Sequence, residues 1–265
     1  MPEELVILEF AQGVAVLTLN DPDRRNILSV PMVHAIGAAM DAAEADESIR
    51  CVVVTGAGRA FCAGAELGLL RAAADGSFDE VELVYRGFLR VRESPLPTIA
   101  AVNGPAVGAG FNLALACDVR LAGEHARFDS RFAALRLHPG GGHAWLLAQA
   151  VGQQRATLAC LFGEVWDARK ALDVGLVAAV VDDDVAVTDD HTGVTEAAVA
   201  LGQQIVPLER EYTERLVATL RATAATATHA DALAAETAAQ RWSVGRPDFL
   251  EGLTAMEARL AARGR

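Results

Sequence analysis

The chain has 265 residues and a mass of 27.8 kDa, and no linker rich in Pro, Gly, Ser or charge divides it, so we expect one domain of catalytic size. Its 35 Asp and Glu residues outnumber its 23 Lys and Arg residues, giving a net charge of -12 and a pI of about 4.9. This sign excludes a general binder of nucleic-acid phosphates, and an anionic small ligand would require a local cluster of arginines and backbone amides.

The first part of the chain alternates predicted strands and helices. Two β-rich runs at 5–10 and 14–19 are separated by Ala-Gln-Gly, the pattern of a hairpin. Ser29, followed by Val-Pro, predicts a helix N-terminus, and we expect this helix to continue to about Ala45. The run CVVVT at 51–55 is continuously apolar and predicts a strand buried on both faces.

The same alternation continues through the middle of the chain and gives way to helices. We predict a helix over 79–93, a strand over 98–102, a helix from Gly108 to about Cys117, a strand over 118–121, and helices over 145–151, 154–162, 167–173 and from Thr195 onwards. This order predicts an α/β core over residues 1–195 and a helical region over 196–265. The acidic segment 180–193 is predicted to be a solvated loop; the alternative, a cation site, lacks the ligand spacing of a calcium loop.

Membrane, export and metal signals are all weak. The most apolar window, 97–117, contains Asn, Gly and Pro at several positions, so we expect no membrane partner. The N-terminal MPEELVILEF lacks the basic and apolar regions of a secretory signal, which predicts a cytoplasmic location. Cys51, Cys62, Cys117 and Cys160 are far apart in sequence, which predicts reduced, packed thiols and no metal site.

Two glycine clusters invite a nucleotide-binding interpretation, and both fail. The clusters at 56–61 and 108–113 lack the third glycine of G-x-G-x-x-G, and neither leads into the Gly-Lys-Ser/Thr of a P-loop. The chain also has no G-x-S-x-G, so a hydrolase nucleophile elbow has no support. These glycines therefore serve another purpose.

Five ordered segments resemble the crotonase, or enoyl-CoA hydratase/isomerase, superfamily. They are DPDRRNILS at 21–29, GRAFCAGAEL at 58–67, LPTIAAVNGPAVGAGFNLALACDVRLA at 96–122, FGEVWDARKALDVGLVAAVV at 162–181 and RPDFLEGLTAMEAR at 246–259. The resemblance implies a crotonase-like spiral of ββα units and a helical C-terminal region that packs in a homotrimer or hexamer. It also implies an acyl-CoA thioester as substrate and no separate cofactor, since coenzyme A enters as part of the substrate.

The resemblance implies an oxyanion hole made of two backbone N–H groups, at Ala65 and Ala109. Thioester chemistry in the family passes through an enolate, whose negative oxygen needs fixed donors. Gly108 and Gly110 would let the acyl carbonyl approach the backbone. The helix that opens at Gly110 would point the positive end of its dipole at the negative oxygen and stabilise it. The alternative is that these glycines only permit tight turns.

Further residues match the family's substrate-binding segments. Arg24 and Arg25 correspond to positions that hold the CoA phosphates and adenine, although arginines after a turn are also common as surface charges. Ala63, Glu66 and Leu67 belong to the loop around the first oxyanion-hole residue. The alternative role of Glu66 is to brace that loop by hydrogen bonds.

Two positions depart from the family pattern. Asn112 and Phe132 stand where the family usually places two working glutamates. Hydration needs a base and an acid that contribute about 10² to 10⁴ each, whereas an amide accepts no proton at neutral pH and a phenyl ring neither donates nor accepts. We therefore expect slow or absent hydratase activity, with a non-catalytic acyl-CoA binding or regulatory protein as the alternative.

Four nearby residues are candidates to replace the glutamates: Glu66, Asp129, His138 and His143. His138 precedes Pro-Gly-Gly-Gly and is the preferred substitute acid or base; the alternative is a structural loop histidine. His143 begins a predicted helix and could cap it instead. Asp129 and Arg131 alternate in what we predict to be an exposed strand or turn, where they could pair with each other.

Overall fold

The structure is a computed structural model that describes residues 4–74, 78–182, 193–225, 242 and 246–247. The chain forms two compact units, Met1–Val206 and Pro207–Arg265. Residues 183–192 of the predicted acidic loop lie outside the described residues, as does most of the predicted helical region beyond 225. The predicted division at residue 195 into a core and an assembly region stays a prediction.

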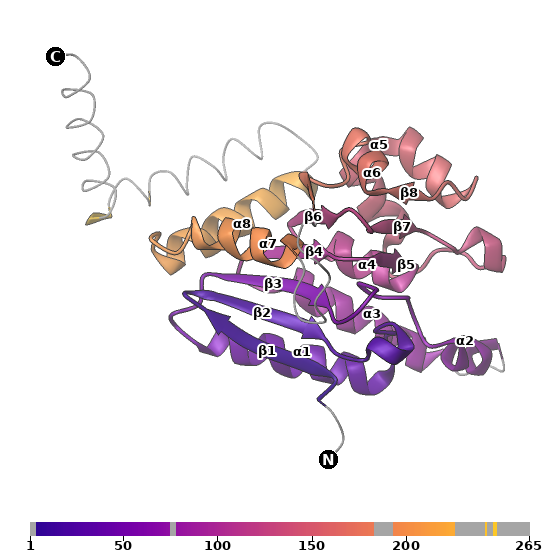
Figure 1. Ribbon diagram of the computed structural model, residues 1–265, viewed down its shortest axis with the longest axis horizontal. Helices are drawn as coiled ribbons and strands as arrows, with labels where there is room; N and C mark the ends of the chain where they lie inside the picture. The colour runs from indigo at the N-terminus through magenta and orange to yellow at the C-terminus, as the bar shows by residue number, and fades with distance from the viewer. Residues whose placement is uncertain (1–3, 75–77, 183–192, 226–241, 243–245, 248–265) are drawn as a thin grey trace. The chain divides into compact units, whose positions relative to one another are not determined.

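The first unit is built on a six-stranded sheet with the order β1-β2-β3-β4-β6-β9. Its strands are β1 (Val6–Ala11), β2 (Val14–Leu19), β3 (Cys51–Gly56), β4 (Thr98–Val102), β6 (Val119–Gly123) and β9 (Ala179–Val181). The first pair is an antiparallel hairpin, as predicted, and every later pair is parallel (Figure 1). A second sheet of β5 (Pro105–Val107), β7 (Arg127–Asp129) and β8 (Trp166–Asp167) was not predicted.

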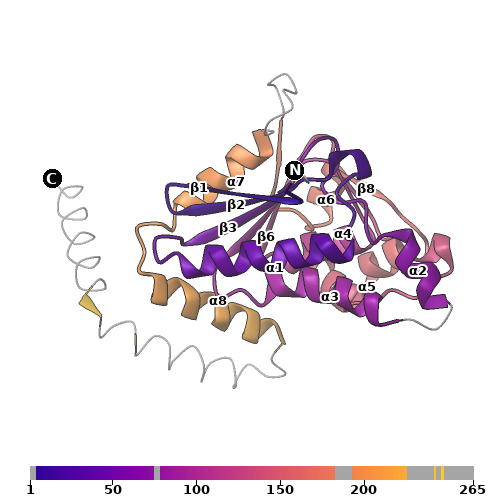
Figure 2. The same cartoon turned by 90° about the horizontal axis from the view of Figure 1, so that it is seen from below.

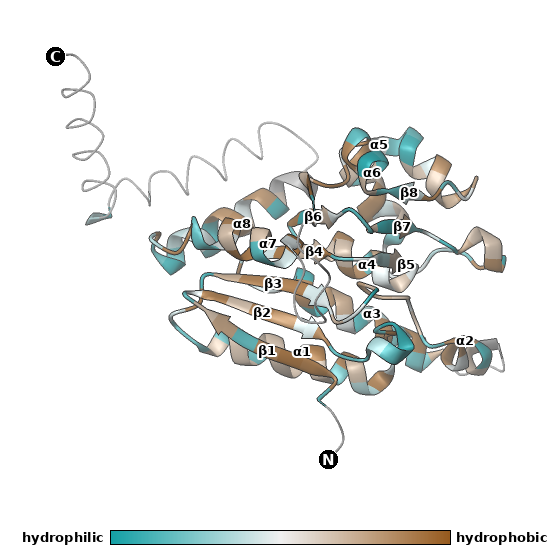
Figure 3. Cartoon of the chain, viewed as in Figure 1, coloured by the Kyte–Doolittle hydropathy of each residue, from teal (hydrophilic) through white to brown (hydrophobic). Residues whose placement is uncertain are grey.

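Helices cover both faces of the larger sheet (Figure 2). α1 (Val30–Ala45) packs against β1 and β2, and α7 (Gly193–Gln203) packs against the sheet from β2 to β9. The other helices of this unit are α2 (Leu67–Ala74), α3 (Asp79–Arg92), α4 (Ala109–Ala116), α5 (His143–Cys160) and α6 (Ala168–Asp173). In β3, Val52 and Val54 belong to the core that includes α1, α3 and α4, whereas Cys51 and Val53 pack in the core that includes α7. Because alternate residues of β3 face two different cores, both faces of this strand are buried and its sequence is continuously apolar. The strand is brown in Figure 3.

Local signals explain where the helices begin and bend. Ser29 caps α1 as predicted, because its side chain accepts a hydrogen bond from Met32 N. Asp167 caps α6 in the same way through Lys170 N. The two helices predicted over 145–151 and 154–162 both lie within α5, and Gly152, with non-helical φ of 78° and ψ of 160°, separates them as predicted.

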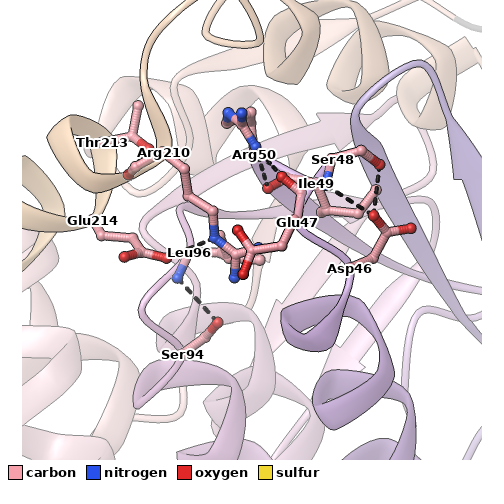
Figure 4. Close-up of polar contacts among 10 residues, drawn as sticks. All are labelled: Asp46, Glu47, Ser48, Ile49, Arg50, Ser94, Leu96, Arg210, Thr213 and Glu214. Carbon is pink, nitrogen blue, oxygen red and sulfur yellow. Dashed lines mark hydrogen bonds and ion pairs between the residues drawn. The ribbon is translucent and has the colours of Figure 1, made fainter.

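A short turn connects α1 to β3 (Figure 4). Asp46 Oδ1 accepts hydrogen bonds of 2.8 Å from Ser48 N and 2.7 Å from Ser48 Oγ, and Arg50 Nη1 donates to the carbonyl oxygen of Glu47 at 2.7 Å. These bonds fix the direction in which the chain enters the sheet.

The second unit contributes one long described helix, α8 (Arg210–Ala225). Two i,i+4 ion pairs lie along it, Arg210–Glu214 at 2.8 Å and Glu211–Arg215 at 2.9 Å. Among the helices that the structure describes, none combines the length and apolar character needed to cross a bilayer.

Candidate active site

A cavity of about 1070 Å³ lies beside the start of α4. Its walls come from the loop before α2, from α2 and α3, from the end of β5 with the start of α4, and from the loop 130–140. The predicted site residues that line it are Arg24, Arg25, Ala63, Ala65, Glu66, Leu67, Gly108, Ala109, Asn112, Phe132 and His138. The structure thus brings these residues to one cavity, while their roles stay predictions.

Gly110 is the one predicted site residue behind the cavity wall. A Cβ atom built on it would lie 2.1 Å from the carbonyl oxygen of Cys62 and 2.7 Å from its carbonyl carbon. Gly110 therefore allows α4 to pack against the backbone of the Cys62 loop, and it does so without touching the cavity.

Ala65 and Ala109 both line the cavity, and the backbone before Ala65 approaches the backbone before α4. A Cβ built on Gly64 would lie 2.8 Å from Val107 O and 3.8 Å from Ala109 N, and Gly64 has φ of +103°, so a glycine is required here. Ala109 is the first residue of α4, after Gly108 with φ of 53°. Within the described part of the chain, neither N–H donates a hydrogen bond. Both are thus free to bind an oxygen atom from a ligand.

Asn112 lies one turn into α4 and both ends of its amide are engaged. Its Nδ2 donates to the carbonyl oxygen of Gly140 at 3.1 Å, so its Oδ1 is the acceptor for His143 Nδ1 at 2.6 Å. His143 Nε2 in turn lies 2.7 Å from Ser130 Oγ. All three side chains are buried, and their hydrogen bonds join the start of α4, the end of β7 and the start of α5.

Aromatic rings surround this histidine. The Phe132 ring centre lies 5.0 Å from that of His143, and the Phe111 ring meets it edge-on at 5.3 Å. Burial among these rings disfavours the imidazolium and lowers the pKa of His143 from 6.5 to about 4. At neutral pH the ring is therefore neutral.

The enoyl-CoA hydratase/isomerase family model matches residues 9–261. This chain belongs to that family. It is 45% identical over 260 residues to a probable enoyl-CoA hydratase, EchA14, of Mycobacterium tuberculosis, covering 96% of this chain and 98% of that protein. It is also 37% identical over 186 residues to the 1,2-epoxyphenylacetyl-CoA isomerase of Escherichia coli, covering 68% of this chain and 71% of that one.

Solved structures of family members share the fold. An enoyl-CoA hydratase from Bacillus anthracis superposes with a TM-score of 0.87 at 27% identity, covering 96% of each chain. A putative enoyl-CoA hydratase from Thermobifida fusca, solved in complex with CoA, gives 0.77 at 28% identity, covering 91% of this chain and 93% of that one. The mixed α/β architecture and the crotonase fold predicted from sequence are thus confirmed.

Within this family fold, the two arginines before α1 differ in their contacts. Arg24 donates to Glu66 Oε1 at 2.9 Å and lies 3.6 Å from Asp21, so Glu66 does brace its own loop against residue 24. Arg25 is exposed, and among the described residues its guanidinium makes no ion pair. Arg25 is thus the cation at the cavity that is available to an anionic ligand.

The remaining acid–base candidates lie in different environments. His138 is exposed at the cavity, and its Nδ1–H donates to the carbonyl oxygen of Pro139 at 2.8 Å. Asp129 and Arg131 do pair, with Arg131 Nε donating to Asp129 Oδ2 at 2.9 Å. Asp129 is buried, however, and the expectation of an exposed strand was wrong at this residue because β7 lies between β5 and β8.

The alternative in which His143 caps α5 is also wrong. Gly142 occupies the N-cap position with φ of 79°, no side chain caps this helix, and the imidazole is turned inward to Asn112 and Ser130. Ser130 itself was missed by sequence reasoning. It stands alone between Asp129 and Arg131, and no known spacing connects a serine to a histidine 13 residues later.

Proposed function

We propose that the cavity binds an acyl-CoA thioester with its carbonyl oxygen between the N–H groups of Ala65 and Ala109. The observation that carries this proposal is that both residues line the cavity with unbonded N–H groups, and that a Cβ built on Gly64, next to Ala65, would lie 3.8 Å from Ala109 N. Fixed donors of this kind stabilise an oxygen that gains negative charge, as in an enolate or a tetrahedral intermediate. The positive end of α4 strengthens the same site.

The CoA portion is proposed to leave the cavity beside Arg24 and Arg25. Both line its edge, and Arg25 offers an exposed guanidinium within a chain whose net charge is -12. A local cation is needed to attract phosphates to such an acidic protein. The solved relative from Thermobifida fusca in complex with CoA supports this ligand class. We propose no resident cofactor, since the thioester carries the coenzyme with it.

The acyl portion is proposed to lie against the apolar wall of the cavity. This wall is formed by Leu70, Phe78, Val81, Val84, Tyr85, Phe132, Leu135 and Leu137. Apolar side chains of this size favour an apolar acyl group by removing its surface from water.

Ordinary hydration of an enoyl group is proposed to be slow. Asn112 has both amide ends engaged, and Phe132 presents a ring where the family usually has a second carboxylate. Neither side chain can take a proton from water or give one to the α-carbon. The nearest buried base, His143, lies behind the cavity wall instead of on it.

The test combines binding with turnover. CoA or acetyl-CoA at millimolar concentration should raise the melting temperature, because a ligand that binds only the folded state stabilises it by mass action. No shift would overturn the proposal. A shift with no turnover on a panel of CoA thioesters would instead favour the non-catalytic acyl-CoA binding or regulatory function.

We also propose that the chain assembles as a homotrimer or hexamer. Three apolar residues within the five that follow α5 remain exposed in the single chain: Leu161 at 68%, Phe162 at 73% and Val165 at 46%. Exposed apolar residues clustered in this way are typical of protein interfaces.

A cytoplasmic location stays a prediction.

A further inference from the structure

Ser130, His143 and Asn112 form a chain of two short hydrogen bonds at the cavity wall. Ser130 Oγ lies 2.7 Å from His143 Nε2, and His143 Nδ1 lies 2.6 Å from Asn112 Oδ1. The three residues are buried, with exposed fractions of 2%, 1% and 1%. A hydroxyl, an imidazole and an orienting group in this order are the arrangement that activates a serine for nucleophilic attack.

The direction of each proton in this chain follows from one anchored amide. Asn112 Nδ2 donates to Gly140 O at 3.1 Å, so Asn112 Oδ1 must accept, and the donor to it is His143 Nδ1–H. A neutral imidazole with its proton on Nδ1 has a lone pair on Nε2. The Ser130 hydroxyl therefore donates to Nε2, which is the orientation in which the histidine can take its proton.

The sheet register places Ser130 beside the proposed oxyanion hole. Val107 in β5 pairs with Asp129 in β7, and Gly108 N donates to Asp129 O at 2.9 Å. A Cβ built on Gly108 would lie 4.0 Å from Ser130 O, and the next residue is Ala109. The short strands β5 and β7 lie side by side in Figure 1. Ser130 and Asn112 both line the cavity, and His143 lies behind them.

We propose that Ser130 is a nucleophile that takes the acyl group from the bound thioester, with His143 as its general base and Asn112 as a positioning residue, so that the chain hydrolyses acyl-CoA. This proposal rests on the proposed binding of a thioester between Ala65 and Ala109. It supplies a reaction that needs neither of the missing glutamates.

The proposed reaction balances with water as the only co-reactant. Ser130 Oγ forms a bond to the carbonyl carbon as its proton passes to His143 Nε2, and the C=O electron pair moves onto the oxygen held by the two N–H groups. Collapse reforms C=O and breaks the C–S bond, and the CoA thiolate takes the proton from Nε2. Water then attacks the Ser130 ester and gives a proton to Nε2. Collapse breaks the C–Oγ bond, Oγ regains the proton, and a carboxylic acid leaves.

Because the third residue, Asn112, carries an amide, we expect only a modest rate of CoA release. An amide at position 112 holds the histidine in the right tautomer but offers no negative charge to an imidazolium, whereas the serine hydrolases of this design use a carboxylate. Asn112→Asp should therefore raise the rate of CoA release by at least about 10-fold, because a carboxylate at that position stabilises the protonated histidine.

The experiment follows the release of CoA thiol from butyryl-CoA, a saturated thioester that cannot be hydrated. The wild type should release CoA above the rate of buffer, Ser130→Ala should lose at least about 100-fold of that rate, and Ser130→Cys should recover part of it. The matched control is Ser48→Ala, whose hydroxyl is exposed in the turn after α1 and should leave the rate unchanged (Figure 4). Acid-quenched wild type should carry the butyryl mass on the peptide that contains residue 130.

Two results separate failure of this proposal from failure of the proposed binding. A melting-temperature shift with CoA, combined with no release or with equal release by wild type and Ser130→Ala, would overturn the role of Ser130 while leaving the binding site intact. Absence of both the shift and the release would overturn the binding proposal itself. Should Ser130→Ala fail to fold, the mass of the quenched wild type decides: butyryl on another peptide, or on none, would contradict the proposal.

Discussion

Asn112 Oδ1 accepts a hydrogen bond of 2.6 Å from His143 Nδ1, across 31 residues of sequence. Asn112, which we predict to stand in place of a family glutamate, is thus the partner of a buried histidine. The pair fixes the tautomer of the ring and the orientation of the amide together. A substitution of either residue should therefore change the orientation of the other side chain.

Acid should destabilise the fold through His143. Burial lowers its pKa to about 4 in the folded chain, against 6.5 for the unfolded chain, so the unfolded state binds the proton first as pH falls. Stability is complete above pH 6.5 and is lost between pH 6.5 and 4, by about 3 kcal/mol from this group. Urea unfolding at a series of pH values measures this loss.

His143→Gln is the control for the acid effect. It removes the titrating group, so the free energy of unfolding should fall less steeply between pH 6.5 and 4 than in the wild type. The comparison concerns the slopes, since the substitution also changes stability at neutral pH by altering hydrogen bonds. Parallel slopes in the two proteins would show that His143 is not the group responsible.

Removing the N–H of Ala109 should weaken turnover without unfolding the chain. Ala109 is the first residue of α4, a position where proline is tolerated because no helical hydrogen bond uses that N–H. Ala109→Pro should lower the rate of CoA release, or of any other thioester turnover, by about 10² to 10³. Ala109→Ser keeps the N–H and is the matched control.

The melting temperature must accompany that comparison. If Ala109→Pro and Ala109→Ser melt alike and turn over thioesters at equal rates, the N–H of Ala109 is not an oxyanion donor. A difference in rate between two equally stable variants supports the proposal.

The sequence was sufficient for most of the larger sheet and its helices. Long apolar runs such as 51–55 and a capped helix start at Ser29 have strong local signals, and they were placed correctly. The sheet of β5, β7 and β8 was missed because its strands have only three, three and two residues. Such short segments depend on tertiary contacts instead of on a pattern of their own.

The cavity was predicted from sequence where motif residues line it, as Ala65 and Ala109 do. Ala65 and Ala109 reach the cavity because Gly64 and Gly108 adopt positive φ, and glycines in a motif signal such turns. The hydrogen bond between Ser130 and His143 could not be predicted, since it joins the end of β7 to the start of α5 only in the folded chain. A hydrogen bond between side chains leaves no periodic signal in sequence.

Gly110→Ala should destabilise the fold. The added Cβ would lie 2.1 Å from Cys62 O, and this neighbour is backbone that can move only if the loop before α2 moves. We expect a loss of about 2 to 3 kcal/mol in the free energy of unfolding, measured by urea denaturation.

Gly37→Ala is the matched control, because a Cβ built there meets nothing within 4 Å in the middle of α1. It should stabilise the chain by roughly 0.5 to 1 kcal/mol, through the higher helix propensity of alanine. Equal effects of the two substitutions would contradict the close packing of α4 on the Cys62 loop.

A charge in the segment that follows α5 should break the proposed assembly. Phe162 is 73% exposed in the single chain, and Phe162→Asp would bury a carboxylate if this residue lies in an interface. Sedimentation of the wild type should show a trimer or hexamer at micromolar concentration, and the variant should shift toward monomer. Phe10→Asp, at another exposed phenylalanine, is the control and should leave the oligomer unchanged.

Two introduced carboxylates test the prediction that Asn112 and Phe132 stand in place of family glutamates. Asn112→Glu combined with Phe132→Glu should raise hydration of crotonyl-CoA from a low baseline, since it supplies the base and the acid that the reaction needs. The gain is limited by the site itself: residue 112 is buried, and the ring of Phe132 packs on His143, so a glutamate there is held partly protonated. The double variant also removes the hydrogen bond from His143 to Asn112.

Hydration is measured by loss of the enoyl absorbance, and His138→Ala is tested in parallel. If wild type hydrates crotonyl-CoA at a rate typical of efficient enzymes and His138→Ala leaves that rate unchanged, neither the missing carboxylates nor His138 governs the chemistry.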